Sequence, residues 1–236
     1  MIDLKDISFG YPGGTLVLDQ LNLSLRAGDR TGLMGANGSG KTTLFHIIMG
    51  LLKPSEGSIE IFGKPVRTEK DFEEVRQRVG LLFQDADDQL FSPTVLEDVA
   101  FGPLNLGKSK EEAKTIAQNT LMSLGLTGFE DRVTHKLSGG EKRLVSLATV
   151  LAMEPEVLLL DEPTTGLDHA TEKRLIEILK GLDLSYILIS HSMDFLMETS
   201  QTIMCIRDGK VLLDDESIPH THVHVHRHGR YVHRHD

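Results

Sequence analysis

A glycine-rich loop near the N-terminus has the composition and spacing of a phosphate-binding loop. Residues 35–42 fit the pattern G-x-x-x-x-G-K-[ST] at every fixed position. Glycine permits the backbone conformations that turn several N–H groups towards one anion, and a following helix adds its partial positive charge. Lys41 is expected to contact the β- and γ-phosphates, and Thr42 to offer its hydroxyl to Mg²⁺. The residues that this loop predicts to bind a nucleoside triphosphate are Gly35, Ala36, Asn37, Gly38, Ser39, Gly40, Lys41, Thr42 and Thr43.

Two carboxylates follow a strongly apolar segment in the second half of the chain. Residues 157–160 form a continuous apolar run, which is typical of a parallel strand buried on both faces, and Asp161 and Glu162 come directly after it. Ligands of α/β proteins bind at this end of the strands. We expect Asp161 to hold Mg²⁺ through water, and Glu162 to polarise the attacking water as a general base. A solvated acidic turn is the alternative, and the glycine-rich loop argues against it.

A second expected helix begins with an unusual pair of glycines. Ser138 and Glu141 have the spacing of a capping box, in which each side chain satisfies the backbone N–H group of the other residue. Gly139 and Gly140 stand between them, although glycine costs about 1 kcal/mol in a helical position, which a cap alone does not explain. The glycines leave the first amide groups of this helix open to an anion. The sequence therefore predicts a second anion-binding helix N-terminus.

Alternating strand and helix patterns position these motifs. Strands are expected at residues 2–9, 16–25, 30–34, 58–62, 79–83, 157–160 and 186–190, and near residues 203 and 211. Helices are expected at residues 41–52, 111–124 and 170–182, from residue 138 onwards and near residue 193. Residues 88–150 contain no convincing strand. The pattern indicates an α/β core that is interrupted by a helical insert.

The bulk composition narrows the class of protein. The formal net charge of −10 opposes a general nucleic-acid-binding surface, so we expect no nucleic-acid partner. The single cysteine, Cys205, excludes an intrachain disulfide framework and fits a reducing compartment. The N-terminus does not resemble a signal peptide, and no apolar stretch approaches the roughly 20 residues that cross a bilayer. We therefore expect a soluble protein.

Taken in order along the chain, these motifs resemble those of an ABC ATPase, and the resemblance covers residues 1 to about 215. The segment Leu137–Glu141 matches the signature motif of that family. By this resemblance, Tyr11 stacks on adenine, and Gln84 is the Q-loop glutamine and a Mg²⁺ ligand together with Thr42 and Asp161. Asp168 then resembles the D-loop aspartate, and His191 the switch histidine beside the γ-phosphate. The alternative for Tyr11 is an aromatic residue that only anchors a turn. For Gln84 it is a solvated side chain, and for His191 it is a structural histidine.

The resemblance also implies a fold and an assembly. The implied fold class is α/β, with a P-loop NTPase (RecA-like) core, an antiparallel β subdomain and an inserted α-helical signature subdomain. We expect one ABC ATPase domain over residues 1–219, with its core at 1–87 and 155–215 and its helical subdomain at about 88–154. ABC ATPases work as head-to-tail dimers, in which ATP lies between the phosphate loop of one subunit and the signature helix of the other.

Several expectations follow for the site and the partners. Lys41, Glu162 and His191 are the expected catalytic residues, and Ser138, Gly139, Gly140, Glu141 and Asp168 are expected to face the nucleotide of the other subunit. The family usually has glutamine where Glu141 stands, and either residue completes the capping box. The expected partners are a second copy, or a closely related ATPase subunit, and integral membrane transporter subunits. The chain would then lie at the cytoplasmic face of the membrane as a peripheral subunit.

Residues 84–103 narrow the resemblance to one group of transporters. This segment resembles that of energy-coupling-factor ATPases, and particularly of cobalt and nickel importers, although Asp85-Ala86 departs from the commoner Asn-Pro. It would lie where the ATPase meets its membrane partner. Phe91, Val95 and Phe101 are therefore candidate contact residues, and ordinary core packing is the alternative.

The C-terminal segment, residues 220–236, is rich in histidine. Five histidines stand at every second position, and His233 and His235 follow them. In an extended chain the five imidazoles would lie on one face, about 7 Å apart. Imidazole suits nickel, zinc, cobalt and copper, so we expect these residues to bind Ni²⁺ or Co²⁺: His220, His222, His224, His226 and His228. The alternative is a purification tag or an incidental tail, and the interleaved Val, Thr and Arg residues favour a native segment.

Together the motifs favour the ATP-hydrolysing subunit of an importer for cobalt or nickel, with ATP and Mg²⁺ as its cofactors. One alternative is an energy-coupling-factor ATPase for a vitamin, with an incidental histidine tail. Another is a soluble ABC ATPase of DNA repair or translation, although no coiled-coil insertion, zinc module or tandem cassette is visible. A nickel storage protein or metallochaperone would explain the tail and leave the ATP site without a purpose.

Overall fold

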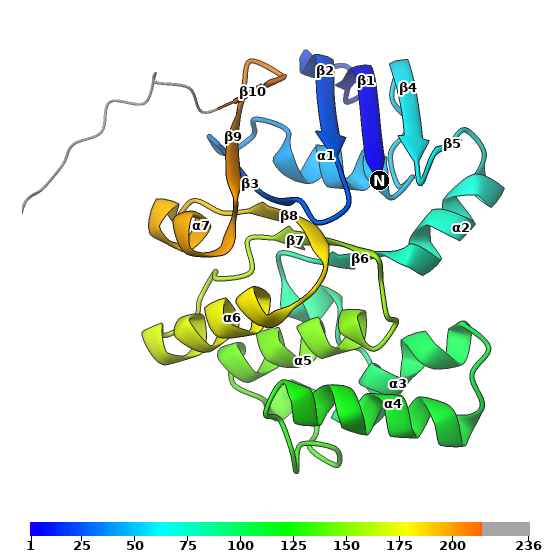
Figure 1. Ribbon diagram of the computed structural model, residues 1–236, viewed down its shortest axis with the longest axis vertical. Coiled ribbons are helices and arrows are strands. Elements are labelled where there is room, and N and C mark those ends of the chain that lie inside the picture. The colour runs from blue at the N-terminus through cyan, green and yellow to red at the C-terminus, as the bar shows by residue number, and fades with distance from the viewer. Residues whose placement is uncertain (214–236) are drawn as a thin grey trace, which may run out of the picture.

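Two β-sheets organise residues 1–213, the part of the chain that the computed structural model describes (Figure 1). One is a four-stranded antiparallel sheet with the order β2-β1-β4-β5, and the other is a six-stranded sheet with the order β10-β9-β3-β8-β7-β6. In the six-stranded sheet only β10 is antiparallel to its neighbour. In Figure 1 the antiparallel sheet lies at the top, helices α3, α4, α5 and α6 lie at the bottom, and the six-stranded sheet lies between them.

The strands and helices follow one another in α/β order. The strands are β1 Ile2–Gly10, β2 Leu16–Leu25, β3 Arg30–Gly35, β4 Glu56–Ile61, β5 Lys64–Pro65, β6 Val79–Leu82, β7 Val157–Asp161, β8 Ser185–Ile189, β9 Thr202–Arg207 and β10 Lys210–Leu213. The helices are α1 Lys41–Ile48, α2 Glu69–Arg78, α3 Val95–Asn105, α4 Lys110–Ser123, α5 Gly139–Leu151, α6 His169–Gly181 and α7 Met193–Thr199. Two short 3-10 turns, η1 Ala86–Asp88 and η2 Thr134–Lys136, flank α3 and α4. The expected fold class is confirmed.

Strand β7 shows how the sequence builds two cores at once. Its side chains alternate, so Val157 and Leu159 pack into the core beneath the antiparallel sheet and α1. Leu158 and Leu160 point to the opposite face and pack into the core that α6 and α7 cover. Every residue of the strand is buried, as the continuous apolar run predicted. Asp161 ends this buried strand and Glu162 follows it directly, so the backbone of both carboxylate residues is held by the core.

Helices α3, α4 and α5 form a unit with a core of its own. Each of the three helices begins with a complete capping box, so their N-termini are satisfied locally. Between residues 88 and 150 the structure contains no strand, only an isolated bridge between Thr94 and Val133. The expected helical insert is therefore seen in this part of the chain.

Three local expectations need correction. The helix after the phosphate loop ends at Ile48 and not at Leu52, because Gly50 adopts a φ of 71° where a Cβ atom would strike the ring of Phe72. Helices α2 and α3 were not anticipated as helices. Val95 is fully buried in the core of the helical unit, so it cannot contact a partner.

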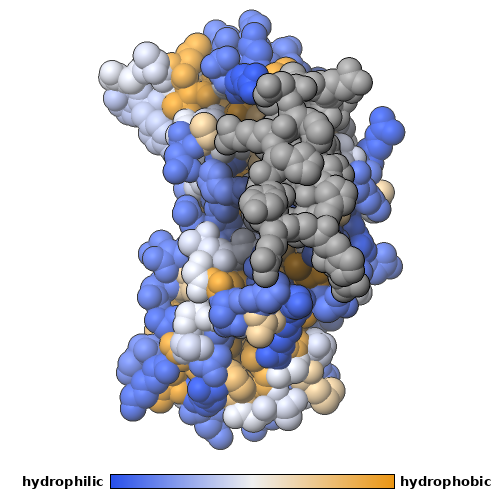
Figure 2. All heavy atoms as spheres, turned by 90° about the vertical axis from the view of Figure 1, so that its left-hand side faces the viewer, coloured by the Kyte–Doolittle hydropathy of each residue, from blue (hydrophilic) through white to orange (hydrophobic). Residues whose placement is uncertain are grey.

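On the side that carries α6 and α7, the surface that Figure 2 draws in colour is largely polar. Figure 2 faces that side, where hydrophilic residues dominate and hydrophobic ones occur in small separate groups. Among residues 1–213, no helix combines the length and the apolar character that a membrane span requires. The histidine-rich segment 220–236 lies outside the described residues.

Candidate functional site

The phosphate loop (residues 35–43) joins β3 to α1, and its glycines are needed for its shape. Gly35 has a φ of 155°, and a Cβ atom there would lie 2.6 Å from Ser39 Oγ and 2.7 Å from the carbonyl oxygen of Ile206. Gly40 has a φ of 101° and is the N-cap of α1, where no side chain caps the helix. The first amide groups of α1 therefore have no side-chain acceptor and can receive an anion.

Lys41 lies inside this loop. Its Nζ donates hydrogen bonds to the carbonyl oxygens of Gly35 at 2.8 Å and Ala36 at 3.0 Å, and the residue is only 7% exposed. Burial lowers the pKa of Lys41, and the nearby carboxylates of Glu162 and Asp161 oppose that shift. The ammonium is thus held by weak neutral acceptors, which a phosphate oxygen would outcompete.

Asp161, at the carboxyl end of β7, meets Thr42 at the start of α1. Thr42 Oγ1 donates a hydrogen bond of 2.7 Å to Asp161 Oδ2, whereas Asp161 Oδ1 is buried without a partner in the described chain. Burial raises the pKa of this carboxyl, against the effect of Thr42 and the nearby cations. A buried carboxylate with an unsatisfied oxygen beside a hydroxyl is a donor set that fits Mg²⁺. A bound cation would lower the pKa of Asp161 again, because it favours the ionised carboxylate.

Glu162 follows in a conformation that is rare for a residue with a side chain. Its φ is 44°, and its backbone N–H donates to the carbonyl oxygen of Ile189 at 3.1 Å. Its Oε1 atom lies 3.1 Å from His191 Nε2, although the two groups are not aligned for a hydrogen bond. Burial raises the pKa of Glu162, while His191 and Lys41 oppose the shift. A carboxylate with a raised pKa is a better proton acceptor, as a general base requires.

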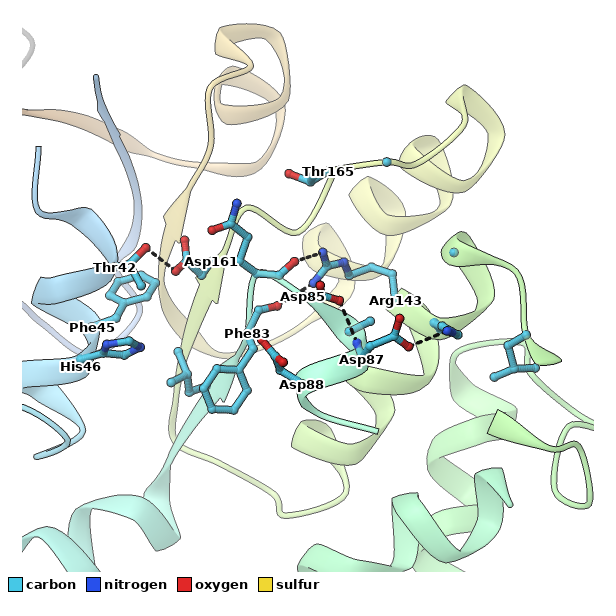
Figure 3. A pocket seen from close by; sticks show the side chains of 17 residues that line it. Thr42, Phe45, His46, Phe83, Asp85, Asp87, Asp88, Arg143, Asp161 and Thr165 are labelled. Atoms are coloured by element: carbon cyan, nitrogen blue, oxygen red, sulfur yellow. Dashed lines mark hydrogen bonds and ion pairs between the residues drawn. The ribbon is translucent and has the colours of Figure 1, made fainter. Parts of the chain in front are cut away.

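A cavity of about 800 Å³ opens between the core and the helical unit. Figure 3 shows it from close by: Thr42 and His46 come from α1, Asp161 from β7, and Arg143 from α5, with residues 83–88 crossing between them. Gln84 and Gly139 also line this cavity. The expected Q-loop glutamine and the expected Mg²⁺ ligands of α1 and β7 therefore lie around one space.

The segment after β6 (residues 83–89) is attached to α5 by three side chains that sequence analysis missed. Arg143, which is almost completely buried, donates to the carbonyl oxygens of Phe83 and Gln84. Gln89 Nε2 donates to the carbonyl oxygen of Ser146 at 2.9 Å and to Thr149 Oγ1 at 2.8 Å. Lys142 forms an ion pair with Asp87. Movement of this segment would therefore be transmitted to α5.

The capping box of α5 is present as expected. The backbone N–H of Ser138 donates to Glu141 Oε2 at 2.8 Å, and the backbone N–H of Glu141 donates to Ser138 Oγ at 3.3 Å. A Cβ atom on Gly140 would press against Thr171 at 3.1 Å, whereas a Cβ atom on Gly139 would meet nothing within 4 Å. Packing therefore explains Gly140 but not Gly139, whose open side remains available to a ligand.

Asp168 is the N-cap of α6, and it accepts hydrogen bonds from the backbone N–H groups of Ala170 and Thr171. Its Oδ2 also accepts from Thr171 Oγ1, the side chain that packs on Gly140. The expected D-loop residue is thus connected through Thr171 to the signature segment (residues 137–141). Within residues 1–213, no hydrogen bond or ion pair joins the signature segment to the phosphate loop.

Tyr11 lies beside the start of α1. Its hydroxyl is 3.2 Å from Thr43 Oγ1, and its ring packs edge-on against Phe9 with centroids 5.0 Å apart. About half of the side chain remains exposed. The ring is therefore anchored next to the phosphate loop with a free face, which suits stacking on a base.

The chain matches the ABC transporter family model over residues 18–165. It is 52% identical over 236 residues to a protein of Nitratidesulfovibrio vulgaris that carries the name of an ABC transporter ATP-binding protein, with 100% of this chain and 86% of that protein covered. It is 44% identical over 216 residues to the energy-coupling factor transporter ATP-binding protein EcfA of Methanocaldococcus jannaschii, with 90% and 77% covered.

Solved structures agree with these sequence matches. CbiO1 of Clostridium perfringens, part of the ABC transporter complex CbiONQ, superposes with a TM-score of 0.80 at 37% identity, and 90% of this chain and 86% of that one are covered. A dimeric structure of the ATP-binding cassette MJ0796 with ADP and phosphate bound superposes with a TM-score of 0.81 at 29% identity, with 89% and 96% covered. The chain belongs to the ABC transporter family, as an ATP-hydrolysing transporter ATPase similar to EcfA and CbiO.

Proposed function

We propose that the chain is the ATPase subunit of an importer for a transition-metal ion, cobalt or nickel, and that two copies hydrolyse ATP head to tail. The observation that carries the ATP site is the convergence of Thr42, Asp161 and Glu162 around the phosphate loop. Asp161 has a buried oxygen without a partner, and Glu162 has a raised pKa. Both features disfavour the free site and favour one that holds Mg²⁺ and a nucleotide.

Each residue of the site has a proposed role. Lys41 and the loop amides bind the phosphates, and Thr42, Gln84 and Asp161 hold Mg²⁺, directly or through water. Mg²⁺, when bound, draws charge from the phosphate oxygens. Glu162 would accept a proton from the attacking water, and His191, whose Nε2 lies 3.1 Å from Glu162 Oε1, would contact the γ-phosphate.

Two copies complete the site in this proposal. The signature segment has an open helix N-terminus at Ser138 and Gly139, yet it makes no hydrogen bond to the phosphate loop of its own chain. A second copy, turned head to tail, would bring its signature segment over the nucleotide. The related cassette MJ0796 has been solved as a dimer with ADP and phosphate bound, which supports the pairing of two copies. A closely related ATPase could take the place of the second copy.

Membrane subunits are the second proposed partner, and they would hold the chain at the cytoplasmic face of the membrane. Phe91 and Phe101 are 67% and 46% exposed, and their rings pack edge to face with centroids 4.8 Å apart. They line a groove of about 330 Å³ between the core and the helical unit. An apolar groove of this kind suits a helix end of a membrane protein. Residues 83–89 lie beside it and connect it to α5.

The cargo is inferred from the sequence of residues 84–103 and from the histidines of the tail. The similarity to EcfA favours a second candidate, an energy-coupling-factor ATPase for another substrate. Removal of residues 220–236 should reduce the binding of Ni²⁺ and Co²⁺ in calorimetric titrations and spare basal ATP hydrolysis. A variant with the five alternating histidines replaced by asparagine is the matched control for loss of chain length.

Uptake measurements decide between the candidates. Cells that contain the chain with its membrane subunits should accumulate radioactive Co²⁺ or Ni²⁺, and Glu162→Gln should abolish this uptake. Accumulation of neither ion, with ATP hydrolysis intact, would reject metal import and leave the energy-coupling-factor alternative. Absence of ATP hydrolysis in the complete complex would reject the proposed motor.

A further inference from the structure

The signature segment carries a negative charge at the position where the proposed dimer would place a triphosphate. Glu141 Oε2 accepts hydrogen bonds from the backbone N–H and from the hydroxyl of Ser138, at 2.8 and 2.9 Å. The hydrogen bonds from Ser138 and the neighbouring guanidinium of Arg132 lower the pKa of this carboxyl, so it is ionised at neutral pH. A carboxylate at this helix N-terminus would repel the γ-phosphate of a facing copy.

Arg132 supplies the opposite charge. Its Nη1 donates to Glu141 Oε1 at 2.7 Å, which is the oxygen that the capping box does not use. The guanidinium lies 4.1 Å from the ring centroid of Phe129, a distance at which a cation is attracted to the ring. Arg132 and Glu141 therefore form a neutral pair, and Arg132 and Ser138 together occupy both carboxylate oxygens.

The backbone of Arg132 is fixed as well. Its N–H donates to the carbonyl oxygen of Phe129 at 2.9 Å, and its own carbonyl oxygen accepts from the N–H of Val95 at 3.0 Å. Val95 is the first residue of α3 and is fully buried. The backbone of Arg132 is therefore held in place within the helical unit, and its side chain loses less conformational entropy when it adopts one position.

We infer that Arg132 is a positioning residue of the signature segment: it holds the Glu141 carboxylate in the capping box and cancels its charge, so that a facing copy can place its triphosphate there. This inference rests on the proposed head-to-tail dimer. An ordinary exposed ion pair would contribute little to stability and nothing to nucleotide-dependent closure. Charge compensation and an ordinary ion pair predict different effects of an Arg132 substitution once Glu141 has lost its charge.

The test measures dimer formation by light scattering as a function of ATP concentration, in chains that carry Glu162→Gln to block hydrolysis. Arg132→Gln should raise the ATP concentration for half-maximal dimer formation about tenfold, because an uncompensated carboxylate then faces the phosphates. Arg132→Lys keeps the charge and should raise it less than about threefold. When Glu141→Gln is added, Arg132→Gln should change the value by less than about twofold, because no charge is left to cancel.

A matched control comes from another arginine with the same surroundings. Arg78 donates to both oxygens of Glu156, at 2.5 and 2.9 Å, and its guanidinium lies 3.6 Å from the ring centroid of Phe62. Arg78→Gln should leave ATP-dependent dimer formation unchanged. Binding of a fluorescent ATP analogue to dilute monomers should also stay unchanged in Arg132→Gln, because the phosphate loop is intact.

Each outcome has a defined meaning. Charge compensation would be overturned if Arg132→Gln raised the ATP concentration for half-maximal dimer formation equally in chains with Glu141 and in chains with Glu141→Gln. It would also be overturned if Arg132→Gln had no effect in either kind of chain. Circular dichroism checks that each variant is folded, and Arg132→Lys keeps the comparison valid if Arg132→Gln is not. If the Glu162→Gln chain binds ATP without forming dimers, the proposed dimer fails and the inference falls with it.

Discussion

The two halves of the proposed ATP site differ in how their polar groups are satisfied. In the phosphate-loop half, Lys41, Asp161 and Glu162 are all more than nine-tenths buried, and each of the two acids has a carboxylate oxygen without a hydrogen-bond partner in the described chain. In the signature half, Ser138 and Glu141 satisfy each other, and Arg132 takes up the remaining carboxylate oxygen. The first half lacks a ligand to be complete, whereas the second is complete by itself.

This difference indicates that the phosphate-loop half depends on a bound ligand for its stability, whereas the signature half keeps its structure without one. A buried, incompletely paired set of charges costs folding free energy until a cation and a polyanion arrive, so ligand binding should strongly stabilise the first half. The second half gains nothing from ligand until another copy presents one. Substitutions in the first half should therefore act on a single chain, and substitutions in the second half should act only on the pair.

The largest expected effect comes from Lys41→Ala. Removal of the only ammonium in the loop should lower ATP hydrolysis by about a hundredfold or more, because the phosphates lose their cation. ATP binding to single chains, followed with a fluorescent analogue, should weaken in parallel. Lys5→Ala, at an exposed site on β1, is the control. Unchanged nucleotide affinity in Lys41→Ala would break the assignment of the first half.

Glu162→Gln should reduce turnover by about a hundredfold and leave ATP affinity nearly unchanged. The amide keeps the shape of the side chain but cannot accept a proton from water. Single-turnover phosphate release with Mg²⁺ present measures the effect. Turnover at the original rate would remove Glu162 from the role of base.

Asp161→Asn should stabilise the nucleotide-free chain while it abolishes stabilisation by Mg²⁺ and ATP. Burial raises the pKa of Asp161 in the folded chain, so the protonated carboxyl stabilises the fold relative to the ionised one. This stabilisation is fully present below the ordinary pKa of an aspartate, and it is lost as the pH rises through the raised pKa. The amide avoids that loss and can still accept the hydrogen bond from Thr42. We expect the Tm at pH 7 to rise by a few degrees, about 1 kcal/mol. A lower Tm would show that the free site is not destabilised by its charge.

The smallest expected effect concerns the connection between the halves. Gln89→Ala should lower the free energy of unfolding by about 1 kcal/mol, because two hydrogen bonds between residues 83–89 and α5 are lost. Basal hydrolysis by the isolated chain should change little, and stimulation by the membrane subunits should fall. Denaturant titrations and stimulated ATPase rates measure the two effects. Full stimulation in the variant would mean that this connection does not transmit movement.

Local patterns in the sequence were sufficient wherever one segment determines its own structure. The apolar run 157–160 predicted a buried strand, and the capping box at Ser138 predicted the start of α5. The order of such segments predicted the α/β core with its helical insert, and the family resemblance implied the antiparallel β subdomain. Helix α3 was not anticipated because Gly102 and Pro103 interrupt its pattern, and packing against α4 and α5 overrides that weakness.

Long-range contacts were beyond sequence reasoning. Arg143 reaches the carbonyl oxygens of residues about sixty positions earlier, and nothing in its own segment indicates this. The positive φ of Glu162 depends on the neighbouring strand β8, which accepts its N–H through Ile189. Arg132 lies in a turn without any motif, and only the fold brings its guanidinium to Glu141. The sequence therefore predicts which residues form the site better than it predicts what holds them in place.

The central claim is that ATP fills the phosphate-loop half of one chain and that the signature half of a second copy then covers the bound nucleotide. Light scattering of the Glu162→Gln chain with ATP and Mg²⁺ tests this most directly, with Ser138→Arg as the companion variant. We predict that ATP doubles the mass of the Glu162→Gln chain, with two nucleotides bound per dimer. The Ser138→Arg variant should bind ATP but keep the mass of a single chain. A chain that is saturated with ATP and stays single, or a Ser138→Arg variant that pairs equally well, would contradict the claim.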